Sequence, residues 1–177
     1  MNESRERFRL LYETHAGRVL AFALRRVNGQ EEAREVVAET FLVAWRRLDQ
    51  VPSDPLPWLF GVARNVIANQ RRSVRRHEAL SSKLAGSAVD VRQHDHADDI
   101  VAHDAVTTAL QRLSGWDQQA LMLVAWEHLD NRRAAAAMGC SPATFAVRLN
   151  RARRRLQREI TRGEEATRFP ALAEEVR

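Results

Sequence analysis

The stretch SPATFAVRLNRARRRLQREI, residues Ser141 to Ile160, divides into two opposed faces when it is wound as an α-helix. Apolar side chains recur along one face with the 3.6-residue period of a helix: Phe145, Leu149, Ala152, Leu156 and Ile160. The opposite face carries Thr144, Val147, Arg148, Arg151, Arg154, Arg155 and Arg158. Six arginines and no carboxylate lie from Arg148 to Arg158, so this face favours an anionic partner.

The residues before this helix predict a tight turn after a shorter, alanine-rich helix over Asn131–Met138. Gly139 can adopt the left-handed conformation that ends a helix, Ser141 can cap the next one, and Pro142 suits its first position. This pattern indicates a helix-turn-helix whose second helix enters the major groove of DNA. The alternative is a basic face that is only solvated. The candidate DNA contacts are Thr144, Arg148, Arg151 and Arg155.

The composition of the 177-residue chain agrees with a nucleic-acid partner. Its net charge is +5 and its pI is about 10.7, which favours binding to phosphate backbones. Lys83 is the single lysine among 28 basic residues, and arginine grips phosphate or guanine with two parallel donors. A GC-rich coding sequence would give the same arginine bias, so the bias decides nothing by itself.

Cysteine usage and apolar patterns exclude several classes of protein. Cys140 is the only cysteine, which rules out an internal disulfide and a zinc finger with several cysteines. The sequence has no run of about 18 apolar residues and no apolar signal core, so we expect a cytoplasmic protein without membrane insertion. We find no nucleophile–base pair, glycine-rich phosphate loop or spaced metal ligands, and we expect no catalytic site and no cofactor.

The first half of the chain contains a predicted helix from Glu31 to Asp49 with two different faces. Its inner face consists of Ala33, Val37, Thr40, Phe41, Ala44 and Leu48. Its outer stripe consists of Glu35, Glu39, Leu42 and Arg46. A leucine among charges on an outward stripe indicates a protein-binding ridge. The alternative is that one exposed leucine has no function, which is the common case.

A proline-rich segment and a second basic helix follow. Residues 50–57, QVPSDPLP, contain three prolines and are predicted to form a stiff loop that presents a pocket. The helix predicted over Trp58–Arg76 has five arginines and no acid from Gly61 onward. Its candidate strand-binding residues are Trp58, Asn65, Asn69, Arg72 and Arg76. An aromatic ring beside amides and arginines can stack on an unpaired base; alternatively, Trp58 only fills the core.

Residues 77–104 differ in character from both flanks. They hold six acidic residues against two basic ones, and they are predicted to form a solvated, flexible linker. Zinc binding by His94, His96 and His103 is the alternative, but closely spaced ligands in such a stretch are usually only hydrophilic, and we predict no metal site. Beyond the linker, Trp116 and Trp126 are predicted core residues.

Motifs in both halves of the chain match one known family. In the first half they are Ala33–Leu42, Trp45, Pro57–Asn65 and Arg71–Arg76. In the second half they are Leu110–Leu113, Met138–Phe145 and Arg151–Arg153. Together they resemble conserved regions 2 and 4 of the extracytoplasmic-function (ECF) sigma factors of bacterial RNA polymerase, in the family's order and spacing.

The resemblance implies partners and roles for these segments. In the family, region 2 binds the polymerase clamp and captures a flipped base of the minus-10 element, whereas region 4 docks on the polymerase flap and reads the minus-35 element. By this resemblance, core RNA polymerase would contact Glu35, Glu39 and Leu42. Promoter DNA would contact Asn65 and the loop before Trp58 in its melted strand, and Arg148 and Arg151 upstream. Family members are commonly inhibited by an anti-sigma factor, which is a further expected partner.

The helix-turn-helix departs from the family pattern at its groove-facing start. Ala143, Thr144 and Phe145 stand where Gly-Thr-Val is usual, and Ala146 and Val147 replace a basic residue and a serine. These changes leave fewer polar groups for hydrogen bonds to bases. Minus-35 readout is therefore expected to rely on backbone contacts and DNA shape.

We predict an all-α sigma factor with two small helical domains joined by a flexible acidic linker. The predicted parts are region 2 (1–76), the linker (77–104), region 4 (105–162) and a C-terminal tail (163–177). The alternative function is a free-standing helix-turn-helix regulator that binds duplex DNA as a dimer. That alternative leaves the stiff loop, Trp58 and Asn65 without a role.

Overall fold

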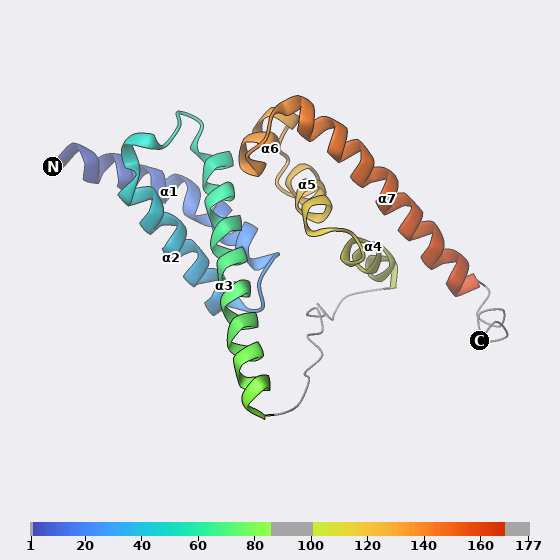
Figure 1. Ribbon diagram of the computed structural model, residues 1–177. Helices are drawn as coiled ribbons and strands as arrows, with labels where there is room; N and C mark the ends of the chain where they lie inside the picture. Colours follow the sequence, from blue (N-terminus) through green and yellow to red (C-terminus); the bar gives the residue numbers. More distant parts are fainter. Residues whose placement is uncertain (1, 86–100, 169–177) are drawn as a thin grey trace. The chain divides into compact units, whose positions relative to one another are not determined.

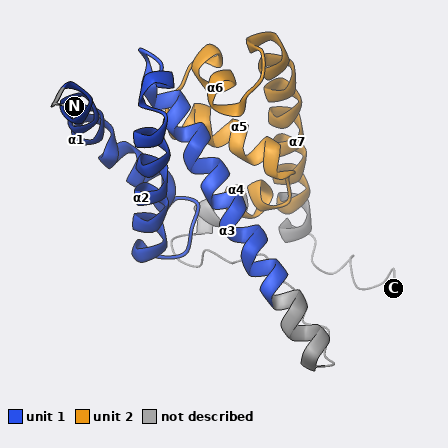
Figure 2. Ribbon diagram, turned by 60° about the vertical axis from the view of Figure 1, so that its left-hand side comes forward, with its two compact units in different colours: residues 1–93 blue, residues 94–177 orange. Residues whose placement is uncertain are grey.

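The computed structural model describes residues 2–85 and 101–168 (Figure 1). Within these ranges the backbone forms seven α-helices, one short 3-10 helix and no strand, which confirms the predicted all-α class. The chain divides into two compact units, residues 1–93 and 94–177 (Figure 2). Each unit has a buried core of its own, as the apolar periodicity on both sides of the polar middle predicts.

Unit 1 consists of three α-helices and one 3-10 turn: α1 (Asn2–Leu24), α2 (Gln30–Arg46), η1 (Leu48–Gln50) and α3 (Pro55–Ala85). The rings of Phe22 and Phe60 stack where α1 meets α3, with 4.7 Å between centroids and 13° between planes. Val19, Val36 and Leu59 are also fully buried. Burial of each such large side chain contributes about 1.5–3 kcal/mol, so this contact fixes α3 on the pair α1–α2.

The connection between α1 and α2 spans residues 25–29. α1 ends at Leu24, and Gly29 precedes α2 with a φ of 99°, which glycine adopts without strain. All six residues of the predicted inner face of the second helix are buried, from Ala33 to Leu48. The outer stripe is therefore left on the solvent side, as predicted.

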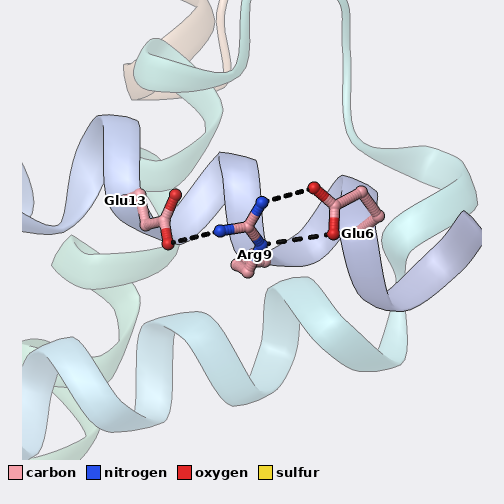
Figure 3. A network of polar contacts seen from close by, with 3 residues as sticks. All are labelled: Glu6, Arg9 and Glu13. Carbon is pink, nitrogen blue, oxygen red and sulfur yellow. Dashed lines mark hydrogen bonds and ion pairs between the residues drawn. The ribbon is translucent and has the colours of Figure 1, made fainter. Parts of the chain in front are cut away.

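A polar network lies on the exposed side of α1 (Figure 3). Arg9 donates to both carboxylate oxygens of Glu6, at 2.5 and 3.2 Å, and to Glu13 at 3.2 Å. The hydrogen bond from Arg9 lowers the pKa of the Glu6 carboxyl. The spacings are i,i+3 and i,i+4, and pairs of this kind on an open helix surface stabilise it only slightly.

The proline-rich loop ends earlier than predicted. α3 begins at Pro55, so Pro55 and Pro57 lie in its first turn and only residues 51–54 form the connection. The prediction of a loop through residue 57 is therefore wrong at this end. N–H groups in the first turn have no acceptor within the helix, so proline loses no hydrogen bond there. Trp58 is consequently carried by a helix.

Helix also occupies both ends of the predicted linker, because α3 continues to Ala85 and α4 begins at Val101. The sequence has no glycine or proline between Gly61 and Ala85, so nothing stops α3 at residue 76. His94, His96 and the side chain of His103 lie outside the described residues. Among the side chains that are described, no three potential metal ligands gather in one place.

Unit 2 consists of four α-helices: α4 (Val101–Gln111), α5 (Gly115–Ala125), α6 (Asn131–Met138) and α7 (Pro142–Arg168). The apolar stripe of α7 is buried at Phe145, Leu149 and Ala152. The alanines of α6 that face inward are also buried, and their small side chains let α7 pack closely. In the part of the chain that the structure describes, no helix has the length and apolarity of a membrane span.

The two tryptophans predicted in the core of this unit differ in position. Trp116 is half-buried on α5, and its ring lies 5.9 Å from that of Phe145. Trp126 is 44% exposed, so the prediction that it belongs to the core is wrong. The physical reason is that α5 ends at Ala125 and Trp126 is its C-cap residue, past the last inward-facing position.

Candidate nucleic-acid interface

The turn between α6 and α7 has the predicted helix-turn-helix chemistry. Gly139 ends α6 in the left-handed conformation, with a φ of 67°. The N–H groups of Gly139 and Cys140 donate to Ala136 and Ala135 at 3.2 and 3.1 Å, which satisfies carbonyls at the helix end. Ser141 Oγ accepts from the N–H of Thr144 at 3.1 Å and so caps α7.

The outer face of α7 is basic and exposed. All seven side chains of the predicted face are exposed: Thr144, Val147, Arg148, Arg151, Arg154, Arg155 and Arg158. Among the described residues, no acidic side chain forms an ion pair with Arg151, Arg154 or Arg158. Val147 is 54% exposed beside Thr144, which places an apolar surface at the start of this face. The face therefore combines free positive charge with one aliphatic group.

Two predicted DNA contacts on α7 are engaged by α5 instead of standing free. The Arg148 guanidinium lies over the Trp116 ring, 5.2 Å from its centroid. Arg155 donates from Nη1 to the Asp117 carboxylate at 2.6 Å. Arg148 and Arg155 are about two helical turns apart and share one edge of α7. Sequence periodicity alone did not separate this edge from the outer face.

On α3, the predicted strand-binding residues Asn65, Asn69, Arg72 and Arg76 are all exposed. Arg72 donates to the side-chain oxygen of Asn69. An open hollow on the helix surface is lined by Asn69, Arg72, Arg75 and Arg76. Trp58 is half-buried in the first turns of the same helix, and a rise of 1.5 Å per residue separates it from Arg76 by about 27 Å. These residues therefore form an extended surface and not one pocket.

Arg71, which the sequence places in the same basic run, has a different role. Its Nη2 donates to the backbone carbonyl of Arg26 at 2.5 Å. Arg26 is buried, donates to the carbonyl of Phe22 at 2.9 Å, and stacks over the Phe22 ring at 3.6 Å. Arg71 thus ties α3 to the end of α1. The local sequence carries no sign of this bond because the acceptor is a backbone atom far along the chain.

On α2, the predicted ridge of Glu35, Glu39, Leu42 and Arg46 is exposed over its whole length. Leu42 is 47% exposed, and the adjoining Trp45 is 43% exposed. The Trp45 ring packs edge-on against Phe8 of α1, with 5.1 Å between centroids. The apolar part of the ridge is therefore larger than the single leucine identified from the helical stripe, and an exposed patch of this kind favours a protein partner.

Two segments of the sequence match known protein families, and these segments carry the surfaces described above. Residues 11–77 match Sigma-70 region 2, and residues 103–156 match Sigma-70, region 4. The first range includes the α2 ridge and the basic face of α3, and the second includes the helix-turn-helix. Together the two matches cover more than half of the chain.

Curated relatives specify the type of sigma factor. The chain is 30% identical over 162 residues to "RNA polymerase sigma factor NccH" of Alcaligenes xylosoxydans xylosoxydans, covering 84% of each chain. It is 28% identical over 152 residues to "ECF RNA polymerase sigma factor SigL" of Mycobacterium tuberculosis, covering 84% of this chain and 86% of the relative. The chain belongs to the ECF sigma factors. The resemblance seen in the sequence is thereby confirmed.

A solved structure of another sigma factor has the same fold. It is the sigma factor RpoE in complex with the anti-sigma factor NepR from Bartonella quintana, with a TM-score of 0.62, 27% identity, and coverage of 87% of this chain and 96% of that chain. The sigma-factor function is therefore favoured over a free-standing regulator. Sigma factors are non-enzymatic initiation factors that bind core RNA polymerase and promoter DNA.

Proposed function

We propose that this ECF sigma factor divides promoter recognition between its two basic helices and binds core RNA polymerase through α2. In this proposal, α7 contacts upstream duplex DNA, and α3 contacts the strand that is melted near the start site. The observation that carries the proposal is the outer face of α7. This face follows the capped turn of the helix-turn-helix. Its exposed residues Arg151, Arg154 and Arg158 form no ion pair with a carboxylate among the described residues.

The α7 surface suits a duplex whose phosphates supply most of the attraction. Arg151 is exposed and unpaired among the described residues, and Arg148 lies at the edge of the same face. Each phosphate neutralised by such a side chain releases counterions, so binding weakens steeply with salt. Thr144 and Val147 lie at the helix start, and a methyl-bearing side chain there favours apolar contact with a thymine methyl group.

The α3 surface suits a single strand. Asn65 and Asn69 offer amide groups for a base edge, and Arg72 and Arg76 offer charge for the backbone. Trp58 is half-buried, so its role is to shape the place where an extruded base is held. Extrusion costs stacking energy, which these contacts offset, so that strand opening is favoured at a matching sequence.

The α2 ridge supplies the protein contacts. Glu35, Glu39 and Arg46 present charge around Leu42, and Trp45 extends the apolar surface. We assign core RNA polymerase to this ridge. An anti-sigma factor is a second partner, supported by the complex of the similar RpoE with NepR. Both interactions imply a cytoplasmic protein, and the family gives no reason to assign a catalytic site or cofactor.

Run-off transcription with purified core RNA polymerase on a pool of genomic promoter fragments tests the proposal. Protein-dependent start sites that share upstream and proximal elements are the expected result. Glu35→Ala with Glu39→Ala should abolish most core binding with the helical signal retained. Glu6→Ala with Glu13→Ala, which removes the same charge from α1, is the matched control. Normal core binding by the α2 variant would reject the ridge.

The assignment of α7 has a separate test. Arg148→Ala with Arg151→Ala should weaken duplex binding and reduce the salt slope, the change in log affinity with log salt concentration, by about one for each phosphate that is no longer neutralised. Arg5→Ala with Arg47→Ala removes equal charge from unit 1 and serves as the control. An unchanged slope in the α7 variant would exclude that helix from DNA binding.

A further inference from the structure

The first turn of α5 is where three helices of unit 2 are joined. Ser114 caps the helix by accepting from the N–H of Asp117 at 3.2 Å. The side-chain amide of Gln118 donates to the carbonyls of Gln111 and Leu113, at 3.2 and 3.0 Å, which ties this turn to the end of α4. Trp116 and Asp117, between these anchors, both face α7. One side of the turn is therefore anchored to the end of α4, and its other side contacts α7.

Asp117 requires a partner because it is only 4% exposed. A carboxylate taken out of water is costly unless a cation or several donors compensate. Arg155 provides that cation at 2.6 Å, and its own side chain is 51% exposed. The pair joins α5 to α7 through residues that are 38 positions apart in the sequence. Because a shift of α7 along its axis would pull Arg155 away from Asp117, the pair holds α7 in place relative to α5.

The same edge of α7 carries a second contact with this turn. Arg148, about two helical turns earlier, stacks over Trp116, and Trp116 packs against the buried Phe145. A shift of α7 by one residue along α5 would break both contacts at once. The edge therefore sets the register and rotation of α7, whereas Arg151 and Arg154 are exposed and form no ion pair among the described residues.

We propose that Arg155 is a positioning residue, which locks α7 on α5 through Asp117 and aims the outer face at DNA, and that the adjacent Arg154 supplies a phosphate contact in its place. This inference rests on the proposed duplex binding by α7. It revises the sequence-based assignment of Arg155 as a DNA contact, since a guanidinium already paired with a buried carboxylate contributes little net charge to a phosphate.

Two neighbouring arginines should therefore behave in opposite ways. Arg154→Gln should reduce the salt slope for a short duplex of mixed sequence by about one, with no change in the urea midpoint of unfolding. Arg155→Gln should leave the slope unchanged but lower the midpoint, because Asp117 is left buried without its cation. At a fixed salt concentration its affinity should fall several-fold as α7 loses its register.

A charge-neutral double variant separates positioning from phosphate binding in a folded protein. Asp117→Leu with Arg155→Met removes one charge of each sign and replaces the ion pair by apolar contact, which is often as stable. We expect its urea midpoint and its DNA affinity to be higher than those of Arg155→Gln and Asp117→Asn, and its salt slope to equal that of the wild type. Asp117→Asn alone should weaken DNA binding although it makes the protein more positive.

The outcomes distinguish this inference from the proposed function beneath it. A slope reduced by about one in the double variant, or in Arg155→Gln with an unchanged midpoint, would show that Arg155 touches phosphate and overturn the assignment. If Arg151→Gln and Arg154→Gln also leave the slope unchanged, duplex binding by α7 is itself rejected, and the positioning role is rejected with it.

Discussion

The two basic helices α3 and α7 look alike in sequence but use their arginines differently. Each is long and has one arginine-rich side, and in each an arginine of that run hydrogen-bonds to another segment of its own unit. On α3 the anchor is Arg71, whose acceptor is a backbone carbonyl. On α7 the anchor is Arg155, whose acceptor is the buried carboxylate of Asp117. A carbonyl leaves the positive charge in place, whereas a carboxylate cancels it.

The difference shows that a count of arginines on a helix does not measure the charge it offers. α7 has six arginines from Arg148 to Arg158, but one is neutralised and another is stacked on an aromatic ring. α3 keeps the charge of its anchor near the end of α1. Salt dependence should therefore be more sensitive to single substitutions on the outer face of α7 than its composition implies.

Removing the largest buried ring from each basic helix should have the greatest effect on stability. Phe60→Ala in α3 and Phe145→Ala in α7 should each lower the free energy of unfolding of their own unit by about 3–5 kcal/mol, because both rings are fully buried. Hydrogen exchange followed by mass spectrometry locates the loss. Leu10→Ala, at a 63% exposed position, is the control and should have almost no effect.

Two glycine substitutions should change stability in opposite directions. Gly139→Ala forces an alanine to a φ of 67° in the helix-turn-helix and should cost about 1–2 kcal/mol. Gly17→Ala lies within α1 with open space around it, and should stabilise unit 1 by about 0.5–1 kcal/mol. Urea denaturation measures both. A Gly139→Ala variant that is as stable as the wild type, or more stable, would mean that the turn tolerates other backbone conformations.

The smallest expected effect is a pH dependence specific to unit 1. Burial, with a further contribution from Arg18, lowers the pKa of His15 below its ordinary value of 6.5, and Asp54 opposes this shift. The unfolded chain therefore binds more protons than the folded one just below pH 6.5, and stability falls as pH decreases through that window. Denaturation between about pH 7 and pH 5 should show a shallower decline in His15→Gln. A steeper decline would contradict the sign.

Local chemistry explains which features the sequence predicted. The caps at Gly139 and Ser141, the first-position Pro142 and the apolar stripe of α7 depend on residues within one or two helical turns, so they can be read directly. The α2 ridge was found in the same way. The assignment of core RNA polymerase to this ridge came from the family resemblance, whereas the candidate DNA contacts on α7 were inferred from the helix-turn-helix pattern.

The missed features depend on where distant segments meet. Asp117 and Arg155 are 38 positions apart, and Arg71 and Arg26 are 45 apart, so no local pattern pairs them. Trp126 was misplaced because its large apolar ring favours the core, although the helix before it ends too soon. The extent of the proline loop was wrong because proline both breaks a helix and suits its first turn.

The two prolines at the start of α3 also determine what that end of the helix attracts. The first N–H groups of a helix commonly bind phosphate, but Pro55 and Pro57 have none to offer. In the proposed contact with a single strand, the sugar–phosphate backbone would therefore gain little at this end and would be drawn toward Arg72 and Arg76. The helix is polarised along its length, with its proline end suited to the flat, uncharged surface of a base and its arginine end to phosphate.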